Sequence, residues 1–128
     1  MIVADSDVLI DYLRGAQPLA DRVEIELKTR SFGTTTVTVF ELWAGAHSPK
    51  QIAAIEHVLD AMILLPLDID AARHAGEVRR DLIGRGLDIG AADCLIAGIC
   101  LTRGATLLTK NKKHFERVPG LKLSLGAV

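Results

Sequence analysis

The chain has 128 residues, of which 49% are hydrophobic and 24% charged, proportions that suit one compact domain over residues 1–128. Its formal net charge of −1 and its aromatic content of 4% exclude a strongly basic nucleic-acid-binding domain and a base-stacking platform. No apolar run is long enough to span a bilayer, and Asp5 comes too early for a signal peptide, so we expect a cytoplasmic protein with no membrane partner.

The order of apolar and polar residues predicts an alternation of short strands and helices. Capping residues mark the helix starts: Ser6 or Asp7, a capping box of Thr38 and Glu41, and Asp70. In the first half of the chain we expect a strand over 1–4, helices over 8–14 and 19–30, and a strand over 34–39 that turns into a helix continuing through residue 45. In the second half we expect a helix over 49–61, a strand over 63–67, helices over 71–84 and 89–101, and strands over 106–108 and 121–125.

Short apolar strands that alternate with helices indicate an α/β domain with a mainly parallel sheet of four to five strands. In such sheets ligands bind beyond the carboxyl ends of the strands. Asp5, Glu41 and Asn111 each come just after a predicted strand. We therefore expect a functional site at this edge of the sheet.

Asp93 is the most informative acidic residue, because nearly every neighbour between Ile89 and Ile99 is small or apolar. A helix of this kind is hydrophobic all round and is expected to be buried. A carboxylate in such surroundings is costly unless it is paired, hydrogen-bonded or bound to a cation. The alternative is a structural role, in which Asp93 pairs with a buried arginine or caps a nearby helix end.

Asp5 and Glu41 are the other candidate acids, and helix capping is the alternative for each. Asp7 can cap the first helix equally well, which leaves Asp5 available for a ligand. For Glu41, a place in the capping box is a sufficient explanation by itself. If Asp5, Glu41 and Asp93 converge, the three cannot stay ionised without a cation or raised pKa values. Oxygen ligands of this kind suit Mg²⁺ or Mn²⁺, which can activate a water molecule against a phosphodiester.

The segment from Thr109 to Arg117, after the fourth predicted strand, combines polar and basic side chains. Asn111 can offer a neutral oxygen to a metal ion, and Thr109 can hydrogen-bond a carboxylate. Positive charge beside an acidic pocket would steer an RNA phosphate toward it. An ordinary solvated loop, with Asn111 as a helix cap, explains the same residues. The basic candidates are Lys110, Lys112, Lys113, His114 and Arg117.

Four blocks of the sequence resemble a PIN-domain nuclease. They are ADSDVLI at 4–10, VFELWAG at 39–45, ADCLIA at 92–97 and LTKNKKHFERVPGL at 108–121. The last block and the chain length are most similar to VapC-type toxins of toxin–antitoxin pairs. The four blocks together are fairly specific, and the resemblance covers essentially the whole chain.

This resemblance implies an α/β/α sandwich, Mg²⁺- or Mn²⁺-dependent endoribonuclease activity, a homodimer, and inhibition by a cognate antitoxin that inserts a segment near the site. It assigns Asp5, Glu41 and Asp93 to the acidic metal-binding positions. Asp7 and Thr109 match positions that support the site. At Asn111 many members have a fourth aspartate, so the missing charge favours a single metal ion.

A haloacid-dehalogenase-like phosphatase is a second hypothesis. Its strand-end Asp-x-Asp motif fits residues 5–7, with Asp5 as nucleophile and Asp7 as general acid. That chemistry also needs a later pair of acidic residues, and no adjacent pair of aspartates follows downstream.

A non-catalytic protein-binding module is a third hypothesis, in which the buried acids are structural. The many aliphatic residues leave enough apolar surface for a dimer and a partner helix. Val37, Phe40 and Trp43 are candidates for such contacts, although core packing is the more ordinary role for each.

Overall fold

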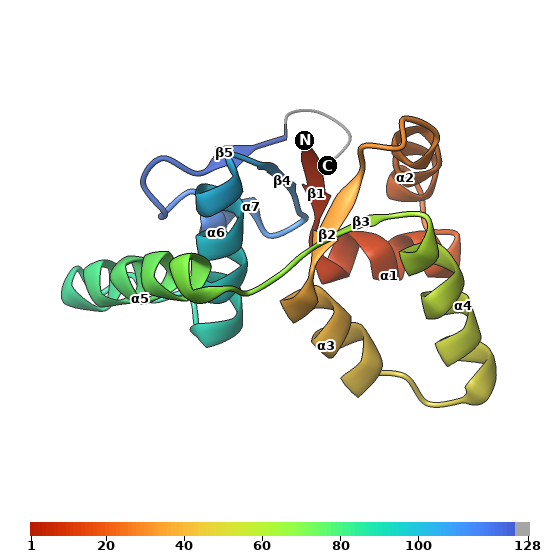
Figure 1. Cartoon of the computed structure of the whole chain (residues 1–128), viewed down its shortest axis with the longest axis horizontal. Helices are drawn as coiled ribbons and strands as arrows, with labels where there is room; N and C mark the ends of the chain where they lie inside the picture. The colour runs from red at the N-terminus through yellow and green to blue at the C-terminus, as the bar shows by residue number, and fades with distance from the viewer. Residues whose placement is uncertain (125–128) are drawn as a thin grey trace.

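A computed structural model describes residues 1–124 of the chain. A five-stranded sheet runs through the middle of the molecule, with helices on both sides (Figure 1). All the pairings are parallel, in the order β3-β2-β1-β4-β5, which places β1 at the centre. The strands are β1 (Ile2–Ala4), β2 (Gly33–Thr35), β3 (Ile63–Leu65), β4 (Thr106–Leu108) and β5 (Lys122–Leu123).

The helices form two groups, one on each side of the sheet (Figure 1). The first group, at the right of the view, consists of α1 (Ser6–Arg14), α2 (Leu19–Lys28), α3 (Thr36–Ala44) and α4 (Pro49–Asp60). The second consists of α5 (Ile69–Gly84), α6 (Ala91–Arg103) and the short α7 (Lys112–Phe115). This arrangement confirms the predicted three-layer α/β/α sandwich around a parallel sheet.

Successive residues of the central strands belong to opposite cores. Val3 of β1 packs in the core that contains α5 and α6, whereas Ala4 packs with α1, α2 and α4. Leu107 and Leu108 of β4 repeat this alternation, and all four side chains are fully buried. Because side chains alternate along a strand, a strand covered on both faces is apolar throughout. That is why these strands were recognisable as short apolar runs.

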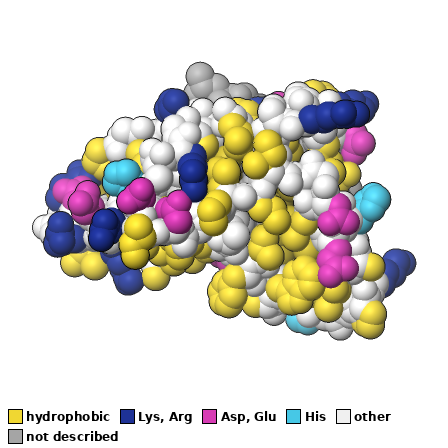
Figure 2. Space-filling model, in the orientation of Figure 1, with side chains coloured by type: hydrophobic (Ala, Val, Ile, Leu, Met, Phe, Trp, Pro, Cys, Tyr) yellow, Lys and Arg dark blue, Asp and Glu magenta, His cyan; other side chains and the backbone are white. Residues whose placement is uncertain are grey.

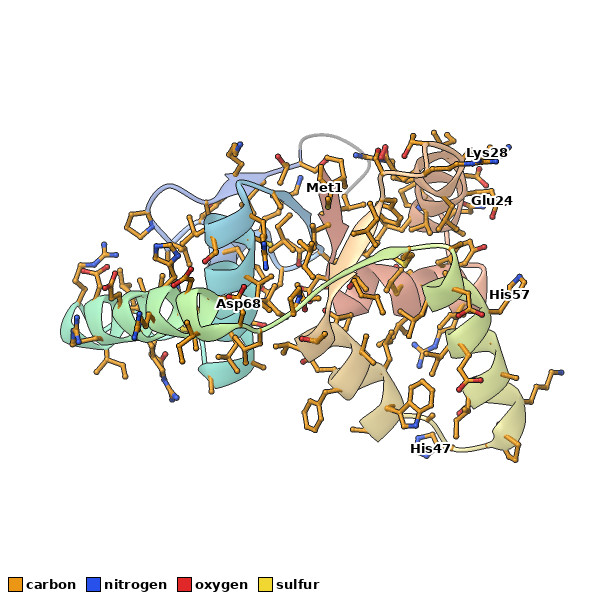
Figure 3. All side chains as sticks on the ribbon, viewed as in Figure 1. Met1, Glu24, Lys28, His47, His57 and Asp68 are labelled. Atoms are coloured by element: carbon orange, nitrogen blue, oxygen red, sulfur yellow. The ribbon has the colours of Figure 1, made fainter. Side chains whose placement is uncertain are left out.

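Close packing of α5 on α6 fixes the second helical layer. A Cβ added to Gly98 of α6 would lie 2.6 Å from the carbonyl oxygen of Ala71 and 2.6 Å from the amide nitrogen of Ala75. Asp68, which lies at the start of α5 (Figure 3), forms an ion pair of 2.7 Å with Arg103 and so joins the two helices as well. These contacts hold α6, which carries Asp93 in its first turn, against α5.

Two helix starts on the site side differ from the prediction. Asp5 caps α1, since its side chain accepts a hydrogen bond from the amide of Ser6, so capping by Ser6 or Asp7 was wrong. Thr35 caps α3, since its hydroxyl accepts from the amide of Thr38 at 3.0 Å. The second strand therefore ends at Thr35, and the capping box at Thr38 was also wrong. Several neighbouring polar residues can each serve as a cap, and local sequence does not choose between them.

Other boundaries shift by a few residues. Asp68 rather than Asp70 caps α5, accepting from the amide of Ala71 at 2.9 Å. The second helix ends at Lys28, β3 ends at Leu65, and α6 spans Ala91–Arg103 rather than 89–101. Residue 125 of the last expected strand lies outside the described residues. Among residues 1–124, no helix combines the length and the apolar character needed to cross a membrane.

Candidate active site

The two central strands place Asp5 and Thr109 side by side. The Asp5 amide donates to the carbonyl of Leu108 at 2.9 Å, which extends the pairing of β1 with β4 beyond the end of β1. The hydroxyl of Thr109 donates to Oδ2 of Asp5 at 2.8 Å, and the amide of Ser6 donates to Oδ1 at 2.8 Å. Both Asp5 and Thr109 are buried, so the carboxylate is held in one position.

Burial raises the pKa of Asp5 to about 7. The charge of Asp7 adds to this rise and that of Asp93 contributes less, while the hydrogen bonds from Thr109 and Ser6 oppose it. The negative charge on Asp5 is thus poorly compensated at neutral pH. A cation beside the carboxylate would favour the ionised form and lower the pKa again.

Glu41 is the sixth of the nine residues of α3, so it lies within the helix and does not cap it. Its Oε1 is buried and has no hydrogen-bond partner in the part of the chain that the structure describes. Burial raises the pKa of Glu41, a hydrogen bond with the side chain of Ser6 opposes this rise, and the charges of Asp93 and Asp7 add to it. A buried carboxylate oxygen without a partner is costly, and a bound cation would satisfy it.

Asp93 lies at the exposed start of an otherwise buried helix. Its side chain is 22% exposed, so Asp93 is less buried than its apolar neighbours led us to expect. Its closest basic partner is Nδ1 of His114, at 3.5 Å, and not a buried arginine. Burial raises the pKa of Asp93, and His114 offsets part of that rise.

The acidic side chains form a cluster, although not a closed set of ligands. The charges of Asp7 and Asp93 raise the pKa values of both Asp5 and Glu41, so the four carboxyl groups lie in one region. Over residues 1–124, no three His, Cys, Asp or Glu side chains stand in position to hold a metal ion as they are placed. A hydrated Mg²⁺ needs only one or two carboxylates, because it keeps several of its waters. The oxygen donors and the unpartnered Oε1 of Glu41 therefore fit a hard, partly hydrated cation.

Asp7 supports the loop that follows β4. Its two carboxylate oxygens accept from the backbone amide of Lys110 at 3.2 and 3.3 Å. The ammonium group of Lys110 forms an ion pair of 3.0 Å with Asp11. The charge of Lys110, which the sequence assigned to RNA steering, is thus largely balanced by α1.

Asn111 lies at the start of α7 but does not cap it with its side chain. Its backbone amide donates to the hydroxyl of Thr109 at 3.0 Å, and its Nδ2 lies 2.8 Å from Nδ1 of His114. Thr109 therefore links Asp5 to Asn111. His114, which the sequence suggested only as a source of positive charge, connects Asn111 with Asp93.

The remaining basic candidates differ in their surroundings. Lys113 is exposed and Lys112 is half-buried, and no ion pair engages either of them among the described residues. Arg117 donates to the carbonyl of Leu87 at 3.5 Å, in the loop before α6. The two lysines are therefore the candidates most available to a phosphate.

A cavity of about 530 Å³ lies between α1, α3 and α4, with Glu41 in its wall. Sequence reasoning missed it, because three separate helices form it and no local pattern marks it. His47, in the loop between α3 and α4, also lines it (Figure 3). Its apolar lining comes from Ile10, Leu13, Leu42, Ala46, Ala54 and Ile55, and its basic lining from Arg14 and Lys50.

Apolar side chains are exposed near the same end of the molecule, and Figure 2 shows them gathered over the region of α3 and α4. Phe40 is 68% exposed and Trp43 42%, so core packing was the wrong expectation for both. Val37 is buried, as that expectation required. A second, mostly apolar hollow of about 440 Å³ lies beside Phe40, between α3 and the start of α6.

Comparison with known sequences identifies the family. The sequence model of the PIN domain matches residues 2–121. The tRNA(fMet)-specific endonuclease VapC of Shigella flexneri is 31% identical over 122 residues, which cover 92% of each chain. Its counterpart in Salmonella typhimurium is 31% identical over 106 residues, 80% of each chain. Ribonuclease VapC19 of Mycobacterium tuberculosis is 31% identical over 124 residues, 95% of this chain and 98% of that one.

Solved structures share the fold over nearly the whole chain. VapBC2 from Rickettsia felis, bound to a DNA fragment from the promoter, matches with a TM-score of 0.86 and 24% identity, covering 97% of this chain and 98% of that one. DNA-bound VapBC from Salmonella typhimurium matches with a TM-score of 0.85 and 28% identity, covering 96% of each chain. The chain belongs to the PIN domain family and, within it, to the VapC-type ribonucleases.

Proposed function

We propose that this chain is a metal-dependent endoribonuclease, the toxin of a toxin–antitoxin pair. Its 31% identical relatives are named as VapC ribonucleases, and PIN-domain ribonucleases of this kind depend on a metal ion. The observation that carries the proposal is the buried, unpartnered Oε1 of Glu41, in the same acidic cluster as Asp5 with its pKa of about 7. Because the negative charge of this cluster is poorly compensated, a bound cation would stabilise it.

The proposed ligands are Asp5, Glu41 and Asp93, with Asn111 as a neutral fourth oxygen donor. All are oxygen donors, which favours Mg²⁺ or Mn²⁺ over softer metals, and the neutral Asn111, in place of a fourth aspartate, favours one ion over two. When bound, the ion would supply an activated water molecule and stabilise charge on the leaving oxygen of a phosphodiester.

The surrounding residues have supporting roles in this proposal. Thr109 holds Asp5 through its hydroxyl, and Asp7 holds the loop through the backbone of Lys110. Lys112 and Lys113 attract the RNA phosphate, while Arg117 and Lys110 contribute less because other groups engage them. We also propose that residues 1–128 act as one domain and that the protein works in the cytoplasm.

We propose two protein partners, a cognate antitoxin and a second copy of the chain. Two similar solved structures are VapBC assemblies. The cavity beside Glu41 offers an apolar lining to an inserted antitoxin segment. The exposed Phe40 and the hollow beside it offer an apolar face for a homodimer. Light scattering of the isolated chain tests the dimer, and a monomer that persists at high concentration would contradict it.

Family membership over residues 2–121 favours the nuclease over the phosphatase. Cleavage of RNA, with no hydrolysis of a small phosphomonoester, would separate the two activities.

The decisive experiment compares the native chain with Asp5→Asn and Asp93→Asn. We expect Asp5→Asn to abolish RNA cleavage while the fold, followed by circular dichroism, stays intact. Calorimetric titration with Mg²⁺ and Mn²⁺ should show weaker binding by Asp93→Asn. Undiminished cleavage by Asp5→Asn, or equal metal affinity in Asp93→Asn, would contradict the assignment. Asp60→Asn, at the exposed end of α4, is the matched control and should behave as the native chain.

A further inference from the structure

The cavity between α1, α3 and α4 adjoins the acidic cluster, because Glu41 belongs to both. Glu41 lies on α3, in the first helical group, whereas Asp93 lies on α6, in the second (Figure 1). An RNA phosphate bound at the cluster therefore has the first helical group on one side. A nucleotide that follows the phosphate on that side meets the cavity.

The cavity has the size and the apolar lining of a nucleotide site. Its volume of about 530 Å³ lies within the range of about 300–1,000 Å³ that is usual for cavities that bind small ligands. Its aliphatic lining includes Ile10, Leu42 and Ile55. A nucleobase that is turned out of its stack packs its flat faces against apolar or aromatic side chains. The lining can therefore hold a base.

Two cations give the cavity an excess of positive charge. Arg14 and Lys50 line it, and neither forms an ion pair within residues 1–124. Glu41 is the one acidic residue of the lining in the described part of the chain, and a metal ion would balance its charge. The remaining charge attracts an anion such as the phosphate of a nucleotide.

The loop between α3 and α4 supplies hydrogen-bonding groups to the cavity. The backbone amide of His47 donates to Oε1 of Gln51, and the amide of Gln51 donates to the hydroxyl of Ser48 at 3.1 Å, so the loop is tied to α4. Among the described residues, no hydrogen bond occupies the imidazole of His47 (Figure 3) or Nε2 of Gln51. All three residues line the cavity. Donors and acceptors of this kind can bind the edge of a base.

We propose that this cavity binds the nucleotide next to the cleaved phosphodiester, with its base against the aliphatic lining and its phosphate beside Arg14 and Lys50. The inference rests on the proposed ribonuclease function. It adds a contact with one base, and hence a preference among RNA sequences, to a cluster that acts on the phosphodiester alone. An antitoxin segment inserted in the same cavity would displace this nucleotide and so inhibit the enzyme.

Two neighbouring alanines of α4 provide a test and its matched control. Ala54 lines the cavity, whereas Ala53 is exposed and does not belong to the lining. Ala54→Phe should fill the cavity, and Ala53→Phe adds the same ring outside it. The native chain and both variants, labelled with carbon-13 in their methyl groups, are titrated in EDTA and followed by NMR. The probes are the four nucleoside 5′-monophosphates and ribose 5-phosphate, which lacks the base.

We expect at least one nucleotide to bind the native chain about tenfold more tightly than ribose 5-phosphate does, and to shift the methyl signals of Leu42 and Ile55. Ala53→Phe should keep this preference and Ala54→Phe should lose it. The double substitution of Arg14→Gln and Lys50→Gln should weaken nucleotides and ribose 5-phosphate alike, which tests the site without filling it.

Two results would overturn the inference and leave the cavity to the antitoxin segment. One is equal affinity of the native chain for ribose 5-phosphate and all four nucleotides, and the other is the same preference in both phenylalanine variants. Melting curves establish that the variants fold. A native chain that shows the nucleotide preference but cleaves no RNA would instead contradict the proposed function.

Discussion

Asp5 combines deep burial with a pKa far above that of a free aspartate. Burial raises the pKa from 3.8 to about 7, so between these values the folded chain holds a proton that the unfolded chain has released. Binding of this proton stabilises the folded chain. The stabilisation is complete below pH 3.8 and is lost as the pH rises through about 7. The shift corresponds to at most about 4 kcal/mol.

We therefore expect the metal-free protein to be less stable at pH 8 than at pH 5. Asp5→Asn should flatten this dependence, because the amide does not titrate. Denaturant unfolding in EDTA at the two pH values measures the effect, with Asp60→Asn as the control that keeps the native dependence. The same loss of stability in Asp5→Asn and in the native chain would show that another group controls it.

Thr109 is the buried partner that holds the Asp5 carboxylate. Its hydroxyl donates to Asp5 and accepts from the amide of Asn111, and its side chain is fully buried. Thr109→Val keeps the shape but removes both bonds, so we expect a loss of about 1–3 kcal/mol of stability. The bond from Thr109 lowers the pKa of Asp5, so its loss should raise that pKa further.

Thr109→Ser is the matched control, since it keeps the hydroxyl and removes only a methyl group. Carbon-13 NMR of the Asp5 carboxyl follows the pKa in each variant, and denaturant unfolding follows the stability. If Thr109→Val and Thr109→Ser gave the same pKa for Asp5, the hydroxyl would have no part in setting it.

At the scale of the elements, Gly98 determines how closely α6 approaches α5. A Cβ at this position would meet backbone atoms of Ala71 and Ala75 at 2.6 Å, and backbone atoms cannot move aside as a flexible side chain does. We expect Gly98→Ala to destabilise the protein by about 1–3 kcal/mol through overpacking, despite the better helix propensity of alanine.

Gly76, in the middle of α5, is the natural control for that substitution. A Cβ there would meet nothing within 4 Å. Gly76→Ala should therefore stabilise the protein by up to about 1 kcal/mol. Thermal and denaturant unfolding of the two variants should give opposite signs, and two shifts in the same direction would contradict the packing argument.

The strands and most of the helices could be predicted from the sequence, because their signals are local. β1 and β4 are apolar runs followed directly by polar residues, and Gly15 and Gly104 end α1 and α6 in the left-handed conformation that glycine favours. The parallel sheet followed from the alternation of strands and helices. The candidate site was predicted at the carboxyl edge of this sheet because Asp5 directly follows β1, and it stays a prediction.

Glu41 shows where such prediction fails. Three threonines in a row, at positions 34–36, precede α3, and sequence alone does not tell which neighbouring hydroxyl caps the helix. Because Thr35 caps α3, Glu41 lies in the middle of the helix and not in its first turn, so capping does not explain Glu41. The exposure of Phe40 and Trp43, and the cavity beside Glu41, depend on how separate helices pack. No local pattern records that packing.

At the scale of the whole molecule, the charges are nearly balanced, with a formal net charge of −1. Attraction of RNA must therefore come from a local group of cations. In the segment after β4, Lys110 is paired with Asp11 and Arg117 is engaged by a carbonyl group, so Lys112 and Lys113 are the available lysines of that segment. Both lie at the start of α7, directly after Asn111.

We expect the double substitution of Lys112→Gln and Lys113→Gln to lower kcat/KM for RNA, and to do so mainly at low salt. If each lysine contacts one phosphate, the slope of log(kcat/KM) against log[salt] should become shallower by about 1.4. The control replaces Lys28 and Lys122 with glutamine. Both are exposed, and they lie at the end of α2 and the start of β5, away from the carboxyl edge of the sheet. The control carries the same change in net charge, so parallel slopes for the two double variants would show that overall charge steers the RNA. A shallower slope for the α7 pair alone would place the phosphate path along α7, next to the acidic cluster.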